Sequence, residues 1–265
     1  MKLVLIGSGN TASVLARKFV TAGHTILQIW SRNRQHAEVL AGLTNADVLD
    51  SLHTITPEAD LVVIAVSDQA IPSIASQLQL QHQPVVHTAG AVSRSVLQNC
   101  SAQYGVLYPL QSLRKEQDPV TAIPFLVDAS TPRLLEQLKT IAGSISSLVQ
   151  EATDEQRLHL HLAAVVVNNF TNHLYELAYR YCRNQQVDFQ LLIPLAVETA
   201  LRLGNTSPGL LQTGPASRND TPTIQRHLML LENNPELQHL YENLSNHILA
   251  MYHKKEELRS TNSPI

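Results

Sequence analysis

The sequence predicts an α/β domain built on a parallel β-sheet over residues 1–150, followed by an all-helical domain over residues 151–265. Two observations support this division. In the first part, short apolar runs alternate with segments whose apolar residues recur at helical spacing, which indicates strands and helices in turn. From Thr153 onward the helical spacing continues and no strand pattern is convincing. The alternation implies parallel strands with helices on both faces of the sheet.

The expected strands of the first domain are apolar runs that end in small or turn-forming residues. They are residues 2–7, 25–30, 60–66, 84–90 and 145–150. The run DLVVIAV at 60–66 is unbroken, as expected of a strand that is buried on both faces. Helices are expected over 11–23, 34–43 and 131–143, with a turn and a helix over 67–78. Gly23 is a natural C-cap of the first helix, and Thr131 is a natural N-cap of the last.

The second domain begins with a long pattern of helical spacing. Residues 154–184 predict one helix of about eight turns, at about 3.6 residues per turn. A second helix is expected over 188–204, with a kink at Pro194. Two more are expected over 221–234 and 235–258, because a proline stands close to the start of each.

Composition narrows the class of protein. Of the 265 residues 44% are hydrophobic, which is enough for a sizeable core, and only 15% are charged. The net charge is −3 and the basic residues are scattered, which argues against nucleic acid as a partner. No apolar run approaches the ~18 residues of a membrane span, and the N-terminus lacks the pattern of a signal peptide. We therefore expect a soluble cytoplasmic protein, and the cysteine and histidine spacings predict no metal site.

A glycine motif follows the first expected strand and opens the first expected helix. It reads Gly7-Ser8-Gly9-Asn10-Thr11-Ala12, or GxGxxA. In this context the first glycine permits the tight turn, the second lets a pyrophosphate approach the backbone, and the alanine lets helix and strand pack closely. The helix N-terminus then offers unpaired N–H groups to a phosphate. The motif predicts a Rossmann dinucleotide site, the alternative being a tight turn without a ligand.

The end of the second expected strand indicates which dinucleotide binds. An NAD site places an acidic residue there to hold the ribose 2′-hydroxyl, but this chain reads Trp30-Ser31-Arg32-Asn33-Arg34. Arginine pairs well with phosphate, so Ser31, Arg32 and Arg34 predict NADP, unless the arginines are ordinary surface charges. Small residues end the later strands at positions suited to a cofactor's approach, and these are Val66, Ser67, Ala89 and Gly90.

A family resemblance rests on several of these stretches. The GxGNxA start, SRN after the second strand, VVIAVSD and VVHTAG are similar to the reductase group that includes pyrroline-5-carboxylate reductase, 6-phosphogluconate dehydrogenase and ketopantoate reductase. Residues 211–244 resemble the Rossmann-like proteins with a DUF2520 C-terminal domain. The resemblance implies an NADP-dependent reductase of a small oxo or imino acid, such as ketopantoate. It also implies a homodimer built by the helical half. The alternative is a non-catalytic NADP-binding sensor or scaffold.

Candidate catalytic residues lie on the long helix. His161, Asn168 and Asn172 are spaced seven and four residues apart and are expected to share one face. The two asparagines sit in an apolar stretch, so as buried amides they need partners or face a ligand. The resemblance implies a lysine one turn before such an asparagine, where this chain has Ala164 or Val165. His161 is the nearest replacement as proton donor, or else it is satisfied at the domain interface.

The loop over 213–220 supplies another candidate. Arg218 is expected to bind a substrate carboxylate, whereas Asp220 is expected to cap the following helix. Tyr108 and Gln111 lie where a strand should end near the cofactor, so they either touch substrate or, for the tyrosine, only pack.

Overall fold

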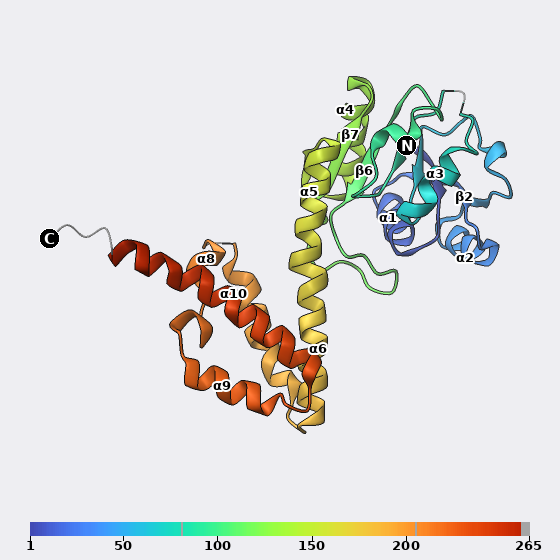
Figure 1. Ribbon diagram of the computed structural model, residues 1–265. Helices are drawn as coiled ribbons and strands as arrows, with labels where there is room; N and C mark the ends of the chain where they lie inside the picture. The colour runs from blue at the N-terminus through green and yellow to red at the C-terminus, as the bar shows by residue number, and fades with distance from the viewer. Residues whose placement is uncertain (81, 205, 261–265) are drawn as a thin grey trace. The chain divides into compact units, whose positions relative to one another are not determined.

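The computed structural model describes residues 1–80, 82–204 and 206–260 (Figure 1). Contacts divide the chain into two compact units, Met1–Thr171 and the part from Asn172 onward. The first unit contains the sheet and also α5 (Asp154–Ala164) and η4 (Val165–Phe170) of the long helix. Residue 150, the boundary expected from the sequence, therefore lies near the end of the sheet, whereas the contacts divide the chain within the helix.

All strands of the first unit belong to one sheet in the order β3-β2-β1-β4-β5-β6-β7-β8. The strands are β1 (Lys2–Ile6), β2 (Thr25–Trp30), β3 (Asp47–Val48), β4 (Leu61–Ile64), β5 (Val85–His87), β6 (Tyr104–Pro109), β7 (Phe125–Ala129) and β8 (Val149–Glu151). Neighbouring strands are parallel except β6 and β7. The strand order reverses between β1 and β4, which is where a fold of this type binds its ligand. The predicted fold class is confirmed.

The sheet has more strands than the sequence predicted. The strands β3 and β7 were not expected, and of β6 only the end near Tyr108 was expected. The antiparallel pairing of β6 with β7 explains part of this difference. Residues 110–124, all described, join these two strands without a helix, so the alternation of strand and helix stops there. The last strand begins at Val149 instead of residue 145 because α4 continues to Ile145.

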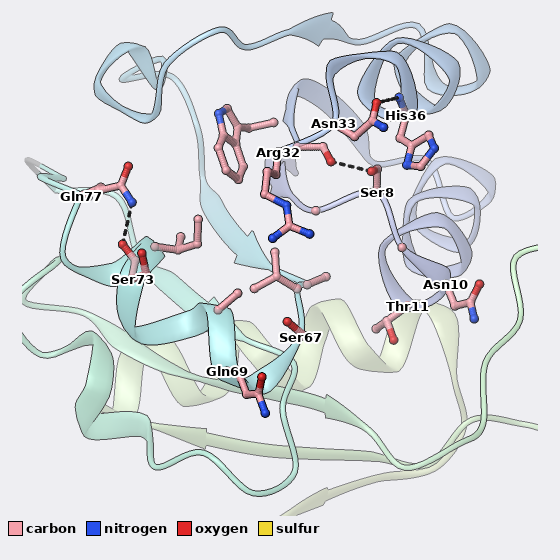
Figure 2. Close-up of a pocket in the computed structure, with 18 residues that line it drawn as sticks. Ser8, Asn10, Thr11, Arg32, Asn33, His36, Ser67, Gln69, Ser73 and Gln77 are labelled. Atoms are coloured by element: carbon pink, nitrogen blue, oxygen red, sulfur yellow. Dashed lines mark hydrogen bonds between the residues drawn. The ribbon is translucent and has the colours of Figure 1, made fainter.

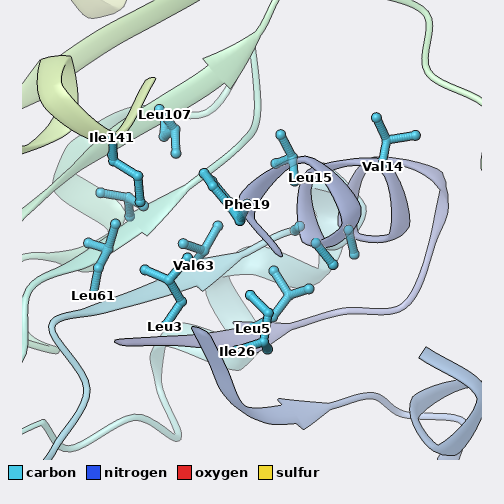
Figure 3. Packing of buried hydrophobic residues seen from close by; sticks show 14 of the residues in the cluster. Leu3, Leu5, Val14, Leu15, Phe19, Ile26, Leu61, Val63, Leu107 and Ile141 are labelled. Carbon is cyan, nitrogen blue, oxygen red and sulfur yellow. The ribbon is translucent and has the colours of Figure 1, made fainter. Parts of the chain in front are cut away.

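Helices cover the sheet on both faces. The helices and helical turns of the first unit are α1 (Asn10–Thr21), α2 (Arg34–Thr44), η1 (Leu52–Thr54), η2 (Asp68–Ala70), α3 (Ile71–Ala75), η3 (Arg94–Leu97), α4 (Pro132–Ile145), α5 and η4. Alternate residues of β1 enter different clusters, because successive side chains of a strand point to opposite faces. Leu3 and Leu5 pack with Phe19 of α1 and Ile141 of α4 (Figure 3). Val4 and Ile6 belong to a second cluster that includes residues of α3.

The described part of the second unit is helical, as predicted. It consists of α6 (Thr171–Asn184, whose first residue belongs to the first unit), η5 (Phe189–Leu192), α7 (Ile193–Arg202), α8 (Pro208–Leu211), η6 (Ala216–Arg218), α9 (Thr221–Leu230) and α10 (Pro235–Ser260). The expected kink at Pro194 is wrong, because this proline stands in the first turn of α7, where its missing N–H costs no helix bond. Asp220 caps α9 as predicted, accepting from the Thr223 N–H at 3.1 Å. No helix in the described residues combines the length and the apolar character needed to cross a membrane.

Candidate functional site

The glycine motif begins with a position, Gly7, that only glycine fits. Gly7 directly follows β1 and has φ +128°, and a Cβ atom there would lie 2.1 Å from the carbonyl oxygen of Ala65, just after β4. The Gly7 N–H donates to the carbonyl of Trp30 at 2.7 Å. The first glycine of the motif therefore joins the ends of β1, β2 and β4 at the point where the strand order reverses.

The next residues present the N-terminus of α1. Gly9 is the N-cap and supplies no side-chain bond, and a Cβ atom there would meet nothing within 4 Å. In the described part of the chain, the N–H groups of Asn10, Thr11 and Ala12 have no acceptor. Unpaired N–H groups at the positive end of a helix dipole, beside open space, suit a phosphate.

A cavity of about 1250 Å³ opens over this turn (Figure 2). Its lining includes nine of the residues predicted for the cofactor, namely Gly7, Ser8, Gly9, Asn10, Thr11, Ser31, Arg32, Val66 and Ser67. Sequence reasoning did not select several other lining residues, among them Trp30, Asn33, His36, Gln69, Ser73 and Gln77. None of the described residues that line the cavity is acidic. The donor set therefore fits a dinucleotide that carries an extra phosphate on its ribose.

The two predicted phosphate-binding arginines differ in position. Arg32 points into the cavity (Figure 2) and makes no hydrogen bond or ion pair within residues 1–80, 82–204 and 206–260. Its neighbour Ser31 accepts a 2.7 Å hydrogen bond from Ser8 of the glycine turn. Arg34 is instead paired with Glu38 at 2.9 Å and with Asp50, and it lines a smaller cavity of about 290 Å³. Of these two arginines, Arg32 is therefore the one available to bind a ligand in the large cavity.

The other two residues predicted for the cofactor, Ala89 and Gly90, do not line this cavity. Both are buried in the segment that follows β5. A Cβ atom on Gly90 would lie 2.7 Å from His161 Nδ1 and 2.8 Å from Tyr108 Cζ. The structure therefore places Gly90 against a second group of residues.

That second group lines a separate cavity of about 550 Å³ within the first unit. Its lining comes from the end of β6 and the residues after it, and from α5 and η4: Tyr108, Leu110, Gln111, Ser112, Leu160, His161, Ala163, Ala164, Val165, Val167, Asn168 and Asn169. The hydroxyl of Tyr108 lies 3.0 Å from His161 Nδ1. The cavity therefore combines a mostly apolar wall with a hydrogen-bonded Tyr–His pair.

A π-helical turn changes the geometry expected of the long helix. Residues 165–170 form this turn, and π turns inside α-helices are frequent at functional sites. The wider turn places Asn169 in the cavity beside Asn168, whose amide donates to it at 3.0 Å. The expectation that the predicted asparagines are buried is wrong, since Asn168 and Asn172 are both exposed. Asn172 and Arg218 belong to the second unit.

Two buried ionisable side chains lie close in sequence to the residues around the Tyr–His pair: His87 of β5 precedes Gly90 by three residues, and Arg157 of α5 precedes His161 by four. Burial, with a smaller contribution from the Arg157 guanidinium, lowers the pKa of His87 to about 4. Arg157 is 1% exposed and donates to Asp154 at 2.6 Å and to the carbonyl of Val92 at 2.5 Å. Asp154 also accepts from the backbone N–H of Arg94 at 3.1 Å. These contacts attach the first turn of α5 to the segment after β5.

Comparison with known proteins places the chain in a family. Residues 2–90 match the family described as "NADP oxidoreductase coenzyme F420-dependent", and residues 123–248 match "Domain of unknown function (DUF2520)". A Bacteroides fragilis protein described as a candidate NADP oxidoreductase is 36% identical, with a TM-score of 0.85 over 94% of this chain and 97% of that chain. A comparison with curated protein sequences gave no match.

Two more distant structures share the fold alone. Pyrroline-5-carboxylate reductase from Streptococcus pyogenes is 14% identical, with a TM-score of 0.64 over 94% of this chain and 98% of that one. An imine reductase from Myxococcus stipitatus, solved in complex with NADP+, is 15% identical, with a TM-score of 0.62 over 97% and 95% of the two chains.

Proposed function

We propose that this chain, which belongs to the Rossmann-like NADP oxidoreductases with a DUF2520 C-terminal domain, reduces a small oxo or imino acid such as ketopantoate. It is an NAD(P)-dependent oxidoreductase, and its cofactor is NADP, as the sequence predicted. The observation that carries the proposal is the large cavity. Among the described residues it offers the unpaired N–H groups of Asn10–Ala12 and an unpaired Arg32, but no carboxylate.

Each part of the cavity has a role in this proposal. The first turn of α1 holds the pyrophosphate through its N–H groups. Arg32, with Ser31, holds the 2′-phosphate by charge-assisted hydrogen bonds. NADPH, when bound, supplies the hydride that reduces the substrate carbon. His161 supplies the proton to the carbonyl oxygen or imine nitrogen of the same bond and is reprotonated from water.

His161 is preferred as the proton donor because of what surrounds it. Ala164 and Val165, the positions where the resemblance implies a lysine, line the second cavity, and no described residue lining it is a lysine or an arginine. We therefore assign the role of proton donor in this cavity to the imidazole of His161. For the substrate carboxylate we propose Arg218 as the binding cation, on its chemistry and its place in the loop before α9.

The test combines binding with turnover. NADPH and NADH are titrated into the purified chain by calorimetry, and a panel of oxo and imino acids, ketopantoate first, is then followed by NADPH absorbance. We expect NADPH to bind and NADH to bind weakly, and at least one acid to be reduced. Arg218→Ala should raise KM for the acid but not for its neutral ethyl ester. If the calorimetry detected binding of neither NADPH nor NADH, the proposed cofactor site would be contradicted. Binding without any turnover would instead favour the non-catalytic sensor or scaffold.

We also infer that a second copy of the chain covers the helical unit. None of the residues of α7 is buried, and Leu195 and Leu201 are 65% and 67% exposed. Apolar side chains gathered in this way mark an interface. Light scattering after size-exclusion chromatography should give a dimer at micromolar concentration. Leu195→Glu with Leu201→Glu should give a monomer, whereas Leu43→Glu, at an exposed leucine of the first unit, should not. A wild-type monomer would contradict the inference.

A further inference from the structure

We infer that Tyr108 and Gly90 position His161 so that its proton is carried on Nε2. Tyr108 fixes the tautomer of the imidazole, and Gly90 provides the space in which the two rings meet. The inference rests on the proposed function, in which His161 gives the proton, and it adds two positioning residues to that role. As Nε2–H gives its proton to the substrate, Nδ1 takes the phenolic proton of Tyr108, so the imidazole stays neutral and the phenolate is reprotonated from water. Neither residue is required to touch the cofactor or the substrate.

The surroundings of the hydrogen bond between Tyr108 and His161 indicate which of the two side chains is the donor. Tyr108 is 9% exposed, and its hydroxyl lies 3.0 Å from His161 Nδ1. Nδ1 is the sole partner of this hydroxyl in the described part of the chain. If Nδ1 carried a proton, the phenolic hydrogen would have no acceptor among the described protein groups, which is costly for a largely buried hydroxyl. The phenol therefore donates to Nδ1, which leaves the proton of the neutral imidazole on Nε2.

Electrostatics of the site agree with a donating phenol. Burial raises the pKa of Tyr108, and the carboxylate of Asp68 raises it further, against a smaller opposite effect of Arg157. The hydroxyl therefore keeps its proton through the whole pH range in which enzymes of this kind work. Nδ1 remains an acceptor whenever the imidazole is neutral.

Gly90 is required because of space and not because of its backbone conformation. Its φ lies outside the left-handed region that favours glycine. A Cβ atom would lie 2.7 Å from Nδ1, 2.8 Å from Cγ of His161 and 2.8 Å from Cζ of Tyr108. These positions belong to the two rings at the hydrogen bond itself. An alanine at position 90 would therefore separate the donor from the acceptor.

Contacts of Arg157, one helical turn before His161, hold α5 against the segment that follows β5. Arg157 precedes His161 by four residues, so both side chains lie on one face of α5. Arg157 is buried and bonded to the carbonyl of Val92, two residues beyond Gly90. Thr153 and Gln156 form a capping box at the start of α5. The segment after β5 is thus attached to α5 on one side and touches the imidazole on the other.

Nitrogen NMR of the complete chain tests the inference without needing a substrate. Histidine is labelled with nitrogen-15, and His161 is assigned among the 12 histidines by the signals lost in His161→Gln. At a pH where the ring is neutral, we expect Nδ1 to resonate as an acceptor and Nε2 as a protonated nitrogen. Tyr108→Phe and Gly90→Ala should both shift the Nδ1 signal and give a mixture of tautomers. Tyr104→Phe, in the same strand, and Gly42→Ala, where a Cβ meets nothing within 4 Å, should leave it unchanged.

The result that overturns the inference is a wild-type His161 protonated on Nδ1, or a Tyr108→Phe signal identical to wild type. Tyr108→Phe decides the question even if Gly90→Ala does not fold. Calorimetry should give NADPH affinities within about twofold of wild type, because neither residue lines the cofactor cavity. With a substrate in hand, Tyr108→Phe should lower kcat about tenfold and leave KM nearly constant. If His161→Gln keeps full turnover, the proposed role of His161 as proton donor is wrong. The tautomer measured by NMR is unaffected by that outcome, because it is measured without a substrate.

Discussion

The two cavities of the first unit are built in different ways. The cofactor cavity rests on one continuous turn, Gly7–Thr11, and on residues that directly follow β2 and β4. The second cavity joins Tyr108 at the end of β6 to His161 on α5, 53 residues apart, with Gly90 between them. The first cavity offers backbone N–H groups and one unpaired guanidinium, whereas the second offers one paired imidazole in an apolar wall. Recognition of the cofactor is thus a local property of the chain, and placement of the proton donor is not.

Glycine has a different function in each region. Gly7 fits a backbone conformation and a close approach of two strands, Gly9 leaves space for a ligand, and Gly90 leaves space for two side chains. Substituting each of them should therefore change a different measurement. The predictions below use these positions and their neighbours to separate the two regions.

The largest effect is expected from Gly7→Ala, which places a side chain in the tight turn beneath the cofactor cavity. The new Cβ would lie 2.1 Å from the Ala65 carbonyl at φ +128°. Strain and the forced separation of β1 from β4 should lower the free energy of unfolding by about 4 kcal/mol. Urea denaturation measures this change, and calorimetry should detect no NADPH binding. Gly42→Ala, inside α2, should instead stabilise the fold by about 0.5 kcal/mol. A Gly7→Ala protein as stable as wild type would show that the turn tolerates a side chain.

The stability of the first unit should respond to pH through His87, which ends β5 three residues before Gly90. Its pKa falls from 6.5 to about 4 on burial in the folded chain. Between these values the unfolded state binds the proton and the folded state does not, so stability is lost as the pH falls. The loss should reach about 3 kcal/mol at pH 4, at about 1.4 kcal/mol per pKa unit.

Urea denaturation from pH 7 to pH 4.5 checks this prediction. His87→Gln should be less stable than wild type at pH 7 but lose much less stability as the pH falls, because the titrating group is gone. His53→Gln, at an exposed histidine, should keep the wild-type slope. Equal slopes in all three proteins would exclude His87 as the source.

The third prediction concerns the two arginines at the edge of the cofactor cavity. Arg32→Ala should weaken NADPH about 30-fold, equivalent to about 2 kcal/mol for charge-assisted bonds to a phosphate. NADH affinity should stay within about twofold of wild type, because NADH lacks the 2′-phosphate. Arg34→Ala should change NADPH affinity less than about threefold, because Arg34 is already paired with Glu38 and Asp50. Calorimetry with both nucleotides measures these effects, and the opposite ranking would assign the phosphate to Arg34.

These differences explain how much could be predicted from the sequence. The strand, glycine turn and helix at the N-terminus could be predicted because each depends on adjacent residues, and Ser31 and Arg32 directly follow the second strand. The paired state of Arg34 could not be predicted, because Asp50 reaches it from 16 positions away. Gly90 was assigned to the cofactor because small residues at strand ends look alike in sequence.

The long helix shows the same limit. Its length over 154–184 was predicted from its periodicity, and the structure confirms one continuous helical run. The π turn at residues 165–170 could not be predicted, since the apolar pattern VVVNNF is compatible with an ordinary α-helix. The turn adds Asn169 to the cavity, which the α-helical spacing of seven and four residues had left out. The hydrogen bond between His161 and Tyr108 could not be predicted either, because it joins the end of β6 to α5 across 53 residues of the chain.

Gly9→Ala has the smallest expected effect and separates folding from cofactor binding. Position 9 has φ −76°, which alanine adopts readily, and a Cβ there meets no protein atom within 4 Å. The free energy of unfolding should therefore fall by only about 0.5 kcal/mol, from the poorer N-cap. NADPH affinity should nevertheless fall about tenfold, equivalent to about 1.4 kcal/mol, because the methyl group occupies the space through which the pyrophosphate reaches the N–H groups of α1. Gly143→Ala, whose Cβ also meets nothing within 4 Å but which lies in α4 away from the cavity, should leave the affinity unchanged. Equal NADPH affinities in Gly9→Ala and wild type would mean that the phosphates do not approach this glycine, and the cofactor would then have to depend on Arg32 and the walls of the cavity alone.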